Sequence, residues 1–272
     1  MKLMTDIDLA NQRVLMREDL NVPMQNGVIT DDSRLKASLP SILAALQQCP
    51  AIILMSHLGR PVEGESSERF SLAPIAHRLS ELLDEDILFA KDWAKVSSAP
   101  GSVTLLENVR FNKGELKNHA SLAKAYADLC DVFVMDAFAS AHRAQASTHG
   151  VARYASIACA GPLLHSELGA LERALVAAKK PMIAVIGGSK ISSKLEVLNE
   201  VSRRCDRLIV GGGIANTFLA AAGYPIGRSL CEWDLLDVAR RLMDRVTIPL
   251  PIDVVVAPSK SQGDQAIVKL AA

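Results

Sequence analysis

The sequence predicts an α/β fold with two doubly wound parallel-sheet domains joined by a helix, the second domain being incomplete. Short apolar runs rich in Val and Ile alternate with amphipathic stretches along most of the 272 residues. This alternation is typical of parallel sheets with helices on both faces. It is interrupted once, by a long helical pattern that begins at Pro162 and is followed directly by a new apolar run. Two sheets separated by one helix follow from these observations.

Residues 1–161 are assigned to the first domain. Its strands are expected where apolar runs are too short for a helix, and its helices where apolar residues recur on one face. Around 158–161 the residues are small, and a flexible pause between the domains is expected there. The expected strands are 13–17, 51–56, 103–107 and 132–136, and the expected helices are 35–47, 72–83 and 119–129.

Residues 162–180 are expected to form the connecting helix. Pro162 occupies a position that the first turn of a helix tolerates. Two lysines directly before Pro181 place cations near the other end, where the proline stops the helix. Residues 181–272 are assigned to a partial second domain of the same Rossmann-like type. Its strands are expected at 182–186, 208–210 and 254–256, and one helix is expected at 195–204.

The composition argues against several classes of protein. The formal net charge is zero and only 4% of the residues are aromatic, whereas a nucleic-acid-binding face needs basic residues and stacking rings. The five cysteines never form CxxC, so zinc and redox motifs are unsupported and free thiols in a reducing compartment are expected. The N-terminal sequence does not resemble a secretory signal, and no apolar run has the length of a membrane span. We expect a cytoplasmic protein with no metal-binding residues, no membrane partner and no nucleic-acid partner.

The segment 13–23, RVLMREDLNVP, is the most informative part of the sequence. Its apolar run predicts a buried strand that ends at Arg17, and Pro23 prevents the sheet ladder from continuing. Asp19 and Asn21 follow the strand directly. The segment therefore predicts a polar cluster at the carboxyl edge of the sheet, where open α/β sheets bind ligands.

Basic residues follow several of the expected strands. Arg17 ends the first strand and Arg34 lies in the next connection, and the later loops contain His57, Arg60, Arg110 and Arg143. Because the carboxyl ends of parallel strands share one edge, we expect these side chains to lie together. With only Asp19 and Asp136 nearby they would repel each other, and arginine suits phosphate and carboxylate oxygens. A single such residue is more simply a surface charge or a structural histidine. Their convergence predicts a small, multiply negative ligand that carries a phosphate.

Two glycine-rich turns follow strands of the second domain. Gly187 and Gly188 precede a helix that is expected to begin near Ser189, and Lys190 and Lys194 share one face of its first turns. Lysines at a helix N-terminus oppose its dipole unless a phosphate binds there. The next turn contains Gly211, Gly212 and Gly213. Together the two turns predict a site for nucleotide phosphates.

Packing alone explains either glycine turn equally well, because glycines between a strand and a helix are common packing devices. Neither turn matches the GxxxxGK[ST] loop, and neither matches GxGxxG followed by an acid for a ribose. A Rossmann-type oxidoreductase that uses NAD is therefore a weaker alternative, which the arginine cluster also disfavours.

The motifs of the chain resemble those of the phosphoglycerate kinase family, in its bacterial form. They are RVLMREDLNVP, DDSRLKASLP, SHLGRP, LENVRFNKGE, DVFVMDAFASAHRAQASTHG, GGSKISSKL and GGGIANTF, and they occur in the order of the family. The resemblance extends over the whole chain, which corresponds to roughly the N-terminal two-thirds of the family's length.

The resemblance implies reversible phosphoryl transfer between 1,3-bisphosphoglycerate and ADP, giving 3-phosphoglycerate and ATP in glycolysis. It also implies a monomer whose two domains close by a hinge motion and which uses Mg²⁺ with ADP or ATP. Arg34 and Lys190 are the expected catalytic residues, because they would stabilise charge on the transferring phosphoryl group. The expected phosphoglycerate-binding residues are Asp19, Asn21, Arg34, His57, Leu58, Gly59, Arg60, Arg110 and Arg143. The expected nucleotide-binding residues are Lys190, Lys194, Gly187, Gly188, Gly211, Gly212 and Gly213.

The sequence departs from the family pattern in two places. Ala139 and Ser140 stand where the family usually has Gly-Thr, which restricts the backbone but keeps a hydroxyl. The Gly-Gly-Asp-Thr turn whose Asp serves the metal in relatives is absent, and Gly263 and Asp264 do not match it. A second hypothesis is therefore a truncated chain that binds 3-phosphoglycerate without turnover, because the later nucleotide and Mg²⁺ elements are absent.

Overall fold

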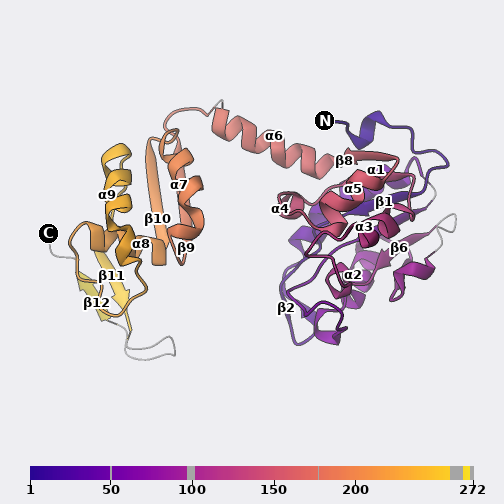
Figure 1. Ribbon diagram of the computed structural model, residues 1–272, viewed down its shortest axis with the longest axis horizontal. Helices are drawn as coiled ribbons and strands as arrows, with labels where there is room; N and C mark the ends of the chain where they lie inside the picture. The colour runs from indigo at the N-terminus through magenta and orange to yellow at the C-terminus, as the bar shows by residue number, and fades with distance from the viewer. Residues whose placement is uncertain (50, 97–101, 177, 258–265, 270–272) are drawn as a thin grey trace. The chain divides into compact units, whose positions relative to one another are not determined.

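The computed structural model describes residues 1–49, 51–96, 102–176, 178–257 and 266–269 (Figure 1). The chain divides into two units, Met1–Leu171 and Glu172–Ala272. Among the helices of the described ranges, none is both long enough and apolar enough to cross a membrane.

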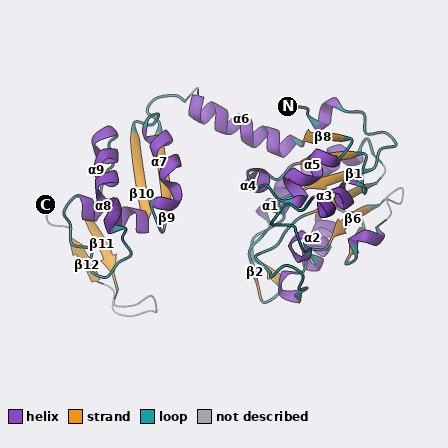
Figure 2. Cartoon of the chain, in the orientation of Figure 1, coloured by secondary structure: helices purple, strands orange, loops and turns teal. Residues whose placement is uncertain are grey.

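A six-stranded parallel sheet forms the centre of the first unit (Figure 2). Its strands are β1 (Val14–Arg17), β4 (Ile52–Met55), β5 (Ile87–Ala90), β6 (Val103–Leu106), β7 (Val132–Met135) and β8 (Ile157–Ala160). The strand order is β5-β6-β4-β1-β7-β8, and every neighbouring pair is parallel. The α/β fold with a parallel sheet that the sequence predicts is confirmed. Because the chain adds β4 on one side of β1 and later β7 on the other, β1 lies where the strand order reverses.

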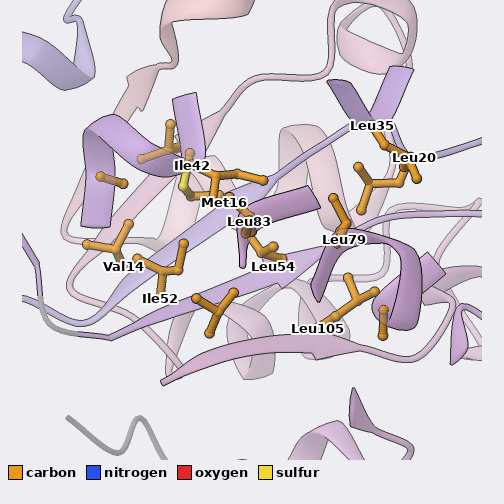
Figure 3. Packing of buried hydrophobic residues seen from close by; sticks show 14 of the residues in the cluster. Val14, Met16, Leu20, Leu35, Ile42, Ile52, Leu54, Leu79, Leu83 and Leu105 are labelled. Atoms are coloured by element: carbon orange, nitrogen blue, oxygen red, sulfur yellow. The ribbon is translucent and has the colours of Figure 1, made fainter. Parts of the chain in front are cut away.

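Helices pack on both faces of this sheet. They are α1 (Ser33–Leu46), α2 (Ala73–Leu83), α3 (Ala120–Ala127), α4 (Phe138–Ala141) and α5 (Val151–Tyr154). Successive side chains of a strand point to opposite faces. Val14 and Met16 of β1 therefore join one buried cluster with Ile42 of α1 (Figure 3), whereas Leu15 joins another with Tyr126 of α3. The two clusters hold the carboxyl ends of the strands in fixed positions.

Short elements occupy the connections of the first unit. A hairpin, β2 (Met24–Gln25) and β3 (Val28–Ile29), lies between β1 and α1. The 3₁₀ turns are η1 (Met4–Asp6), η2 (Glu68–Phe70), η3 (Trp93–Lys95) and η4 (Val109–Phe111), and a π-helical turn, η5 (Ala146–Gly150), precedes α5.

Two strands of the sheet, β5 and β8, are not among those that the sequence predicts. β8 occupies residues for which a flexible pause is expected, and that expectation is wrong. Cys159 and Ala160 are buried, Cys159 pairs with Val134 of β7, and Leu3 forms a bridge to Ala160. Small residues give a weak strand signal. Pairing with segments far away in the sequence makes this one a strand.

In the described residues of the second unit there are two pairs of strands and three further helices. β9 (Ile183–Gly188) and β10 (Arg207–Gly212) are parallel, and β11 (Asp253–Val256) and β12 (Ala266–Lys269) are antiparallel. The helices are α7 (Leu195–Ser202), α8 (Gly213–Ala221) and α9 (Leu236–Arg245), with 3₁₀ turns η6 (Ser192–Lys194) and η7 (Trp233–Leu235). Leu208, Phe218 and Leu242 belong to its buried cluster. Helix α6 (Pro162–Val176) begins in the first unit and ends in the second.

Two carboxyl groups are buried at the carboxyl ends of β1 and β7. Glu18 and Asp136 directly follow the paired residues Arg17 and Met135, and both are inaccessible to solvent. Asp136 Oδ1 accepts a hydrogen bond of 2.8 Å from the backbone N–H of Leu164, in the first turn of α6. Within the described residues, Asp136 Oδ2 and both carboxyl oxygens of Glu18 lack a hydrogen-bond partner. Burial raises the pKa of Asp136 to about 6, and burial together with the charge of Asp136 holds the pKa of Glu18 well above its usual range.

Replacing Glu18 with glutamine is expected to stabilise the first unit at pH values above the ordinary pKa of a glutamate carboxyl group. A carboxyl group whose pKa is raised by folding binds its proton more tightly in the folded state, so the free energy of unfolding falls as pH rises from the unfolded to the folded pKa. Glu18→Gln removes one such group, and we expect a gain of about 1–3 kcal/mol at pH 8. Urea unfolding between pH 4 and pH 8 measures this, followed by the fluorescence of Trp93, the only tryptophan in a Trp233→Phe background. An equal loss of stability at every pH would contradict the prediction.

Candidate active site

The loop after β1 is held by Ser56, the first residue after β4. The Ser56 hydroxyl donates to the carbonyl oxygen of Glu18 at 2.8 Å and accepts from the backbone N–H of Leu20 at 2.9 Å. The residue between them, Asp19, is thereby directed toward α1. Its Oδ2 lies 2.6 Å from Nη1 of Arg34. The sequence pattern predicts Arg34 in a connecting segment, but Arg34 lies in the first turn of α1, where the helix backbone restrains it.

The loop after β4 contains His57, Leu58, Gly59 and Arg60, and the first two of these are buried. The side-chain oxygen of Asn21 accepts from the backbone N–H of Gly59 at 2.9 Å. Gly59 has φ +60°, and a Cβ built there would lie 2.4 Å from the ring of Phe70. Only glycine combines this backbone conformation with so close a neighbour. The loop is thus bound to the segment that follows β1.

Asn108 and Arg110 hold the same loop from the side of β6. The side-chain amide of Asn108 donates to the carbonyl oxygens of Leu58 and Phe70 at 2.8 and 2.9 Å, and its oxygen accepts from the backbone N–H of Arg110. The Arg110 guanidinium donates through Nη1 to the carbonyl oxygen of Gly59. Arg110 Nε is buried, and within the described residues it has no hydrogen-bond partner.

Basic side chains from separate elements converge around His57. The pKa of His57 is lowered to about 2, first by burial and then by the charges of Arg17, Arg110, Arg143 and Arg34, in that order. Burial also lowers the pKa of Arg110, and Arg60 is among the charges that act in the same direction. At neutral pH the imidazole is therefore uncharged. The structure brings together these basic residues as the sequence predicts, and their mutual repulsion favours an anion at this edge of the sheet.

The acidic residues near this edge differ from those expected. Besides Asp19 and Asp136, the described residues place further carboxyl groups here, among them Glu18, Glu115 and Glu167. Glu115 is fully buried and lies near Arg17 and Arg110. The expectation that only two acids lie nearby is therefore wrong. The negative charge of these further carboxyl groups compensates part of the positive charge of the arginine cluster.

Ser56, Asn108 and Glu115 are not among the residues predicted from the sequence, although all three hold loops of the site through hydrogen bonds. The LENVRFNKGE motif contains both Asn108 and Glu115. A buried amide or carboxylate is recognisable only when its partners are known, and those partners lie 32 to 50 residues away in the sequence. Ser140, which stands at the departure from the family pattern, is buried in α4.

The two glycine turns of the second unit pack directly against each other. Gly212 has φ +65°, and a Cβ there would lie 2.7 Å from the carbonyl oxygen of Gly188. A Cβ at Gly213 would lie 2.3 Å from the carbonyl oxygen of Ser189. Close packing of the backbone therefore explains these glycines, which was the alternative to phosphate binding.

Gly187 and Gly211 are in a different position. They are paired in register between β9 and β10. Among the described residues, nothing lies within 4 Å of a Cβ built at Gly187, and only the Cα of Gly187 lies within that distance of a Cβ at Gly211. This part of the strand pair presents backbone without side chains and leaves room for a flat group to lie against it.

The two lysines lie beside these turns, but not on the helix that was expected. β9 continues through Gly188, and α7 begins only at Leu195 after the 3₁₀ turn η6. Lys190 is therefore in an exposed loop, and Lys194 ends the 3₁₀ turn. The Cε of Lys194 would lie 3.1 Å from a Cβ at Gly188, so its aliphatic chain passes over that glycine. A helix near Ser189 is wrong, because strand pairing through the glycines extends β9 beyond the apolar run.

No cluster of three or more His, Cys, Asp or Glu side chains with the spacing of a metal site is present in the described part of the chain. Gly263 and Asp264, which were compared with the family's metal-binding turn, lie outside the described residues.

Comparison with known proteins agrees with this geometry. Residues 4–272 match the sequence model of the family described as phosphoglycerate kinase. The structure of phosphoglycerate kinase from Coxiella burnetii is 52% identical, with a TM-score of 0.80, and the match covers 98% of this chain and 70% of that chain. Phosphoglycerate kinase from Pyrococcus horikoshii OT3 is 31% identical, with a TM-score of 0.84, and the match covers 99% of this chain and 71% of that chain. The chain belongs to the phosphoglycerate kinase family of phosphotransferases.

Proposed function

We propose that this chain catalyses reversible phosphoryl transfer between the acyl phosphate of 1,3-bisphosphoglycerate and ADP, giving 3-phosphoglycerate and ATP. The carboxyl group of 3-phosphoglycerate is then the acceptor in the reverse direction. The observation that carries the proposal is the convergence of Arg34, Arg110 and Arg143 around the uncharged, buried His57. A small molecule with both a phosphate and a carboxylate is the kind of ligand that such a cluster of guanidinium groups stabilises.

The phosphoglycerate is assigned to the first unit. Arg60, Arg110 and Arg143 would bind its phosphate, because guanidinium groups pair with phosphate oxygens in a planar, bidentate manner. Asp19 and Asn21 would orient its hydroxyl, and both are already fixed by Arg34 and by the backbone of Gly59. Leu58 and Gly59 would contribute to the phosphoglycerate site through the backbone of the loop after β4.

The nucleotide is assigned to residues 181–272, with 162–180 as the connection to the phosphoglycerate domain, 1–161. Gly187 and Gly211 provide the bare backbone surface, and Gly188, Gly212 and Gly213 allow the two turns to pack. Lys190 and Lys194 would neutralise the phosphates, and Mg²⁺ enters as part of the Mg-nucleotide substrate. Phosphoryl transfer needs positioning and charge neutralisation rather than a nucleophilic side chain.

A coupled assay of the purified 272-residue chain tests this function. The chain is incubated with 3-phosphoglycerate and MgATP, and formation of 1,3-bisphosphoglycerate is followed through its reduction by an NADH-dependent dehydrogenase. We expect turnover that disappears when Mg²⁺ is chelated. Calorimetric binding of 3-phosphoglycerate without turnover would contradict the proposal and support the binding-only hypothesis. Light scattering on the same sample tests whether the chain is a monomer.

Replacing Lys194 with alanine is expected to weaken nucleotide binding selectively. The side chain of Lys194 lies against Gly188 in the second unit, and its ammonium group is available to the phosphates of a nucleotide. The arginine cluster, by contrast, belongs to the first unit. We expect the dissociation constant for MgADP to rise about tenfold, the effect of one charge-assisted hydrogen bond, while that for 3-phosphoglycerate stays unchanged. Calorimetry with each ligand measures both values. The reverse pattern would contradict the division of binding between the two units.

A further inference from the structure

Arg17, the last residue of β1, is a buried basic residue of the segment 13–23 that the proposed function does not use. Unlike Arg34 and Arg60, it is completely buried. Each of its three guanidinium nitrogens already faces a group of this chain. Nε donates to the hydroxyl of Ser147 at 3.2 Å, Nη1 donates to the carbonyl oxygen of Glu18, and Nη2 lies 3.1 Å from Nδ1 of His57. Arg17 is therefore not placed to contact a ligand, and its role must act through these neighbours.

We propose that Arg17 is a positioning residue that holds His57 in the tautomer with its proton on Nε2, and that Glu115 in turn holds Arg17 through Ser147. The proposal deepens the proposed function, on which it depends only for the identity of the ligand. It concerns three successive hydrogen bonds, which connect Glu115 to Ser147, Ser147 to Arg17, and Arg17 to His57.

The contact between Arg17 and His57 determines where the imidazole proton lies. A guanidinium group has N–H donors and no acceptor, so Nδ1 of His57 must accept from Nη2. An imidazole whose Nδ1 is an acceptor carries its single proton on Nε2. The low pKa of His57, about 2, excludes a second proton at neutral pH. The ring is therefore a neutral Nε2–H donor, and its Nε2 makes no hydrogen bond with any described residue.

The contact between Arg17 and Ser147 is oriented by a buried carboxylate. Ser147 donates from its hydroxyl to Oε1 of Glu115 at 2.5 Å and from its backbone N–H to Oε2 at 3.0 Å. Because the hydroxyl hydrogen is directed at Glu115, the hydroxyl oxygen is free to accept from Nε of Arg17. Burial lowers the pKa of Arg17, and the charge of Glu115 is the largest influence opposing it. Glu115 thus fixes the direction of the guanidinium and compensates its charge.

A neutral donor is suited to this location. The cluster already contains several permanent positive charges, and a protonated histidine would add another beside them at a large cost. An Nε2–H group offers a hydrogen bond to a carboxylate, hydroxyl or phosphate oxygen, while a histidine with its proton on Nδ1 would present a lone pair and repel the same oxygen. The tautomer therefore decides whether His57 attracts or repels the phosphoglycerate.

Nitrogen-15 NMR of the ligand-free chain tests the tautomer directly. In a histidine-labelled sample, we expect the His57 ring to show a protonated Nε2 and an unprotonated Nδ1, unchanged between pH 6 and pH 8. The spectrum of His57→Gln identifies the signal among the six histidines. A proton on Nδ1, or titration of this ring within that range, would overturn the proposal. Because no substrate is present, this result is independent of whether the chain turns over.

Arg17→Lys provides the second arm of the test. Lysine keeps the charge but cannot donate to Ser147 and His57 through one planar fork, so we expect a mixture of His57 tautomers and a rise of about tenfold in KM for 3-phosphoglycerate. Arg13→Lys is the matched control, because Arg13 lies one residue before the same strand and pairs with Asp131 in an exposed position. A native tautomer and native KM in folded Arg17→Lys would also overturn the proposal.

Discussion

Replacing Arg34 with alanine is expected to lower kcat for phosphoryl transfer by at least about 10³-fold, the range associated with an arginine that neutralises a transferring phosphoryl group. The guanidinium is about half exposed, and within the described residues its ion-pair partner is Asp19. Asp19 therefore holds the Arg34 guanidinium on one side, and its exposed side remains open to a ligand. Since little of the side chain is buried, the fold should remain intact.

Steady-state kinetics in the coupled assay and circular dichroism of the purified variant measure these two expectations. Arg34→Lys separates charge from geometry, and we expect an intermediate loss because an ammonium group cannot pair with two oxygens in a plane. Arg78→Ala is the control for loss of a helical arginine, since Arg78 lies on α2 and pairs with Glu81 of the same helix and with Asp32, which precedes α1. Turnover within tenfold of the parent value in folded Arg34→Ala would refute the catalytic role.

Replacing Lys190 with alanine is expected to lower kcat by about 10²-fold or more, while KM for 3-phosphoglycerate stays near its original value. Lys190 is exposed in the loop after β9, and no ion pair to another described residue restrains its ammonium group. A flexible cation there is available to a phosphoryl group in the transition state, which is where removing it should matter most.

The measurement is kcat and KM for both substrates, together with calorimetric binding of MgADP. Arg203→Ala is the control within the same unit, because it removes a positive charge that pairs with Glu200 on the surface. A loss seen equally in KM for 3-phosphoglycerate, or a kcat within threefold of the parent, would contradict the catalytic assignment of Lys190.

Four of the six strands of the first unit, β1, β4, β6 and β7, and its basic cluster were predictable because their signals are local. The runs ending at Arg17 and before His57 are apolar, short and followed at once by polar groups, which is what a buried parallel strand requires. Once such strands are placed in one parallel sheet, topology alone brings their loops to the same edge. No contact between side chains had to be known.

Several features depended on partners that are distant in the sequence. β8 is built of small residues and becomes a strand because β7 and Leu3 supply its pairing. β9 continues through Gly188 because β10 pairs with it and the following turn packs on it, which removes the helix expected near Ser189. Arg34 belongs to α1 rather than to a loop. Apolar periodicity does not mark this boundary, because the first two residues of α1, Ser33 and Arg34, are polar.

The sequence by itself determined the α/β class, the family, and which residue types gather at the carboxyl edge, because these follow from hydrophobic runs and from motif order. Only the tertiary structure decided what each of those residues faces. Arg17 illustrates this division: it ends the first strand as predicted, yet its side chain is buried between Ser147 and His57 rather than open to an anion. Burial, charge and tautomer depend on atoms contributed by segments up to 130 residues away, and no local pattern encodes them.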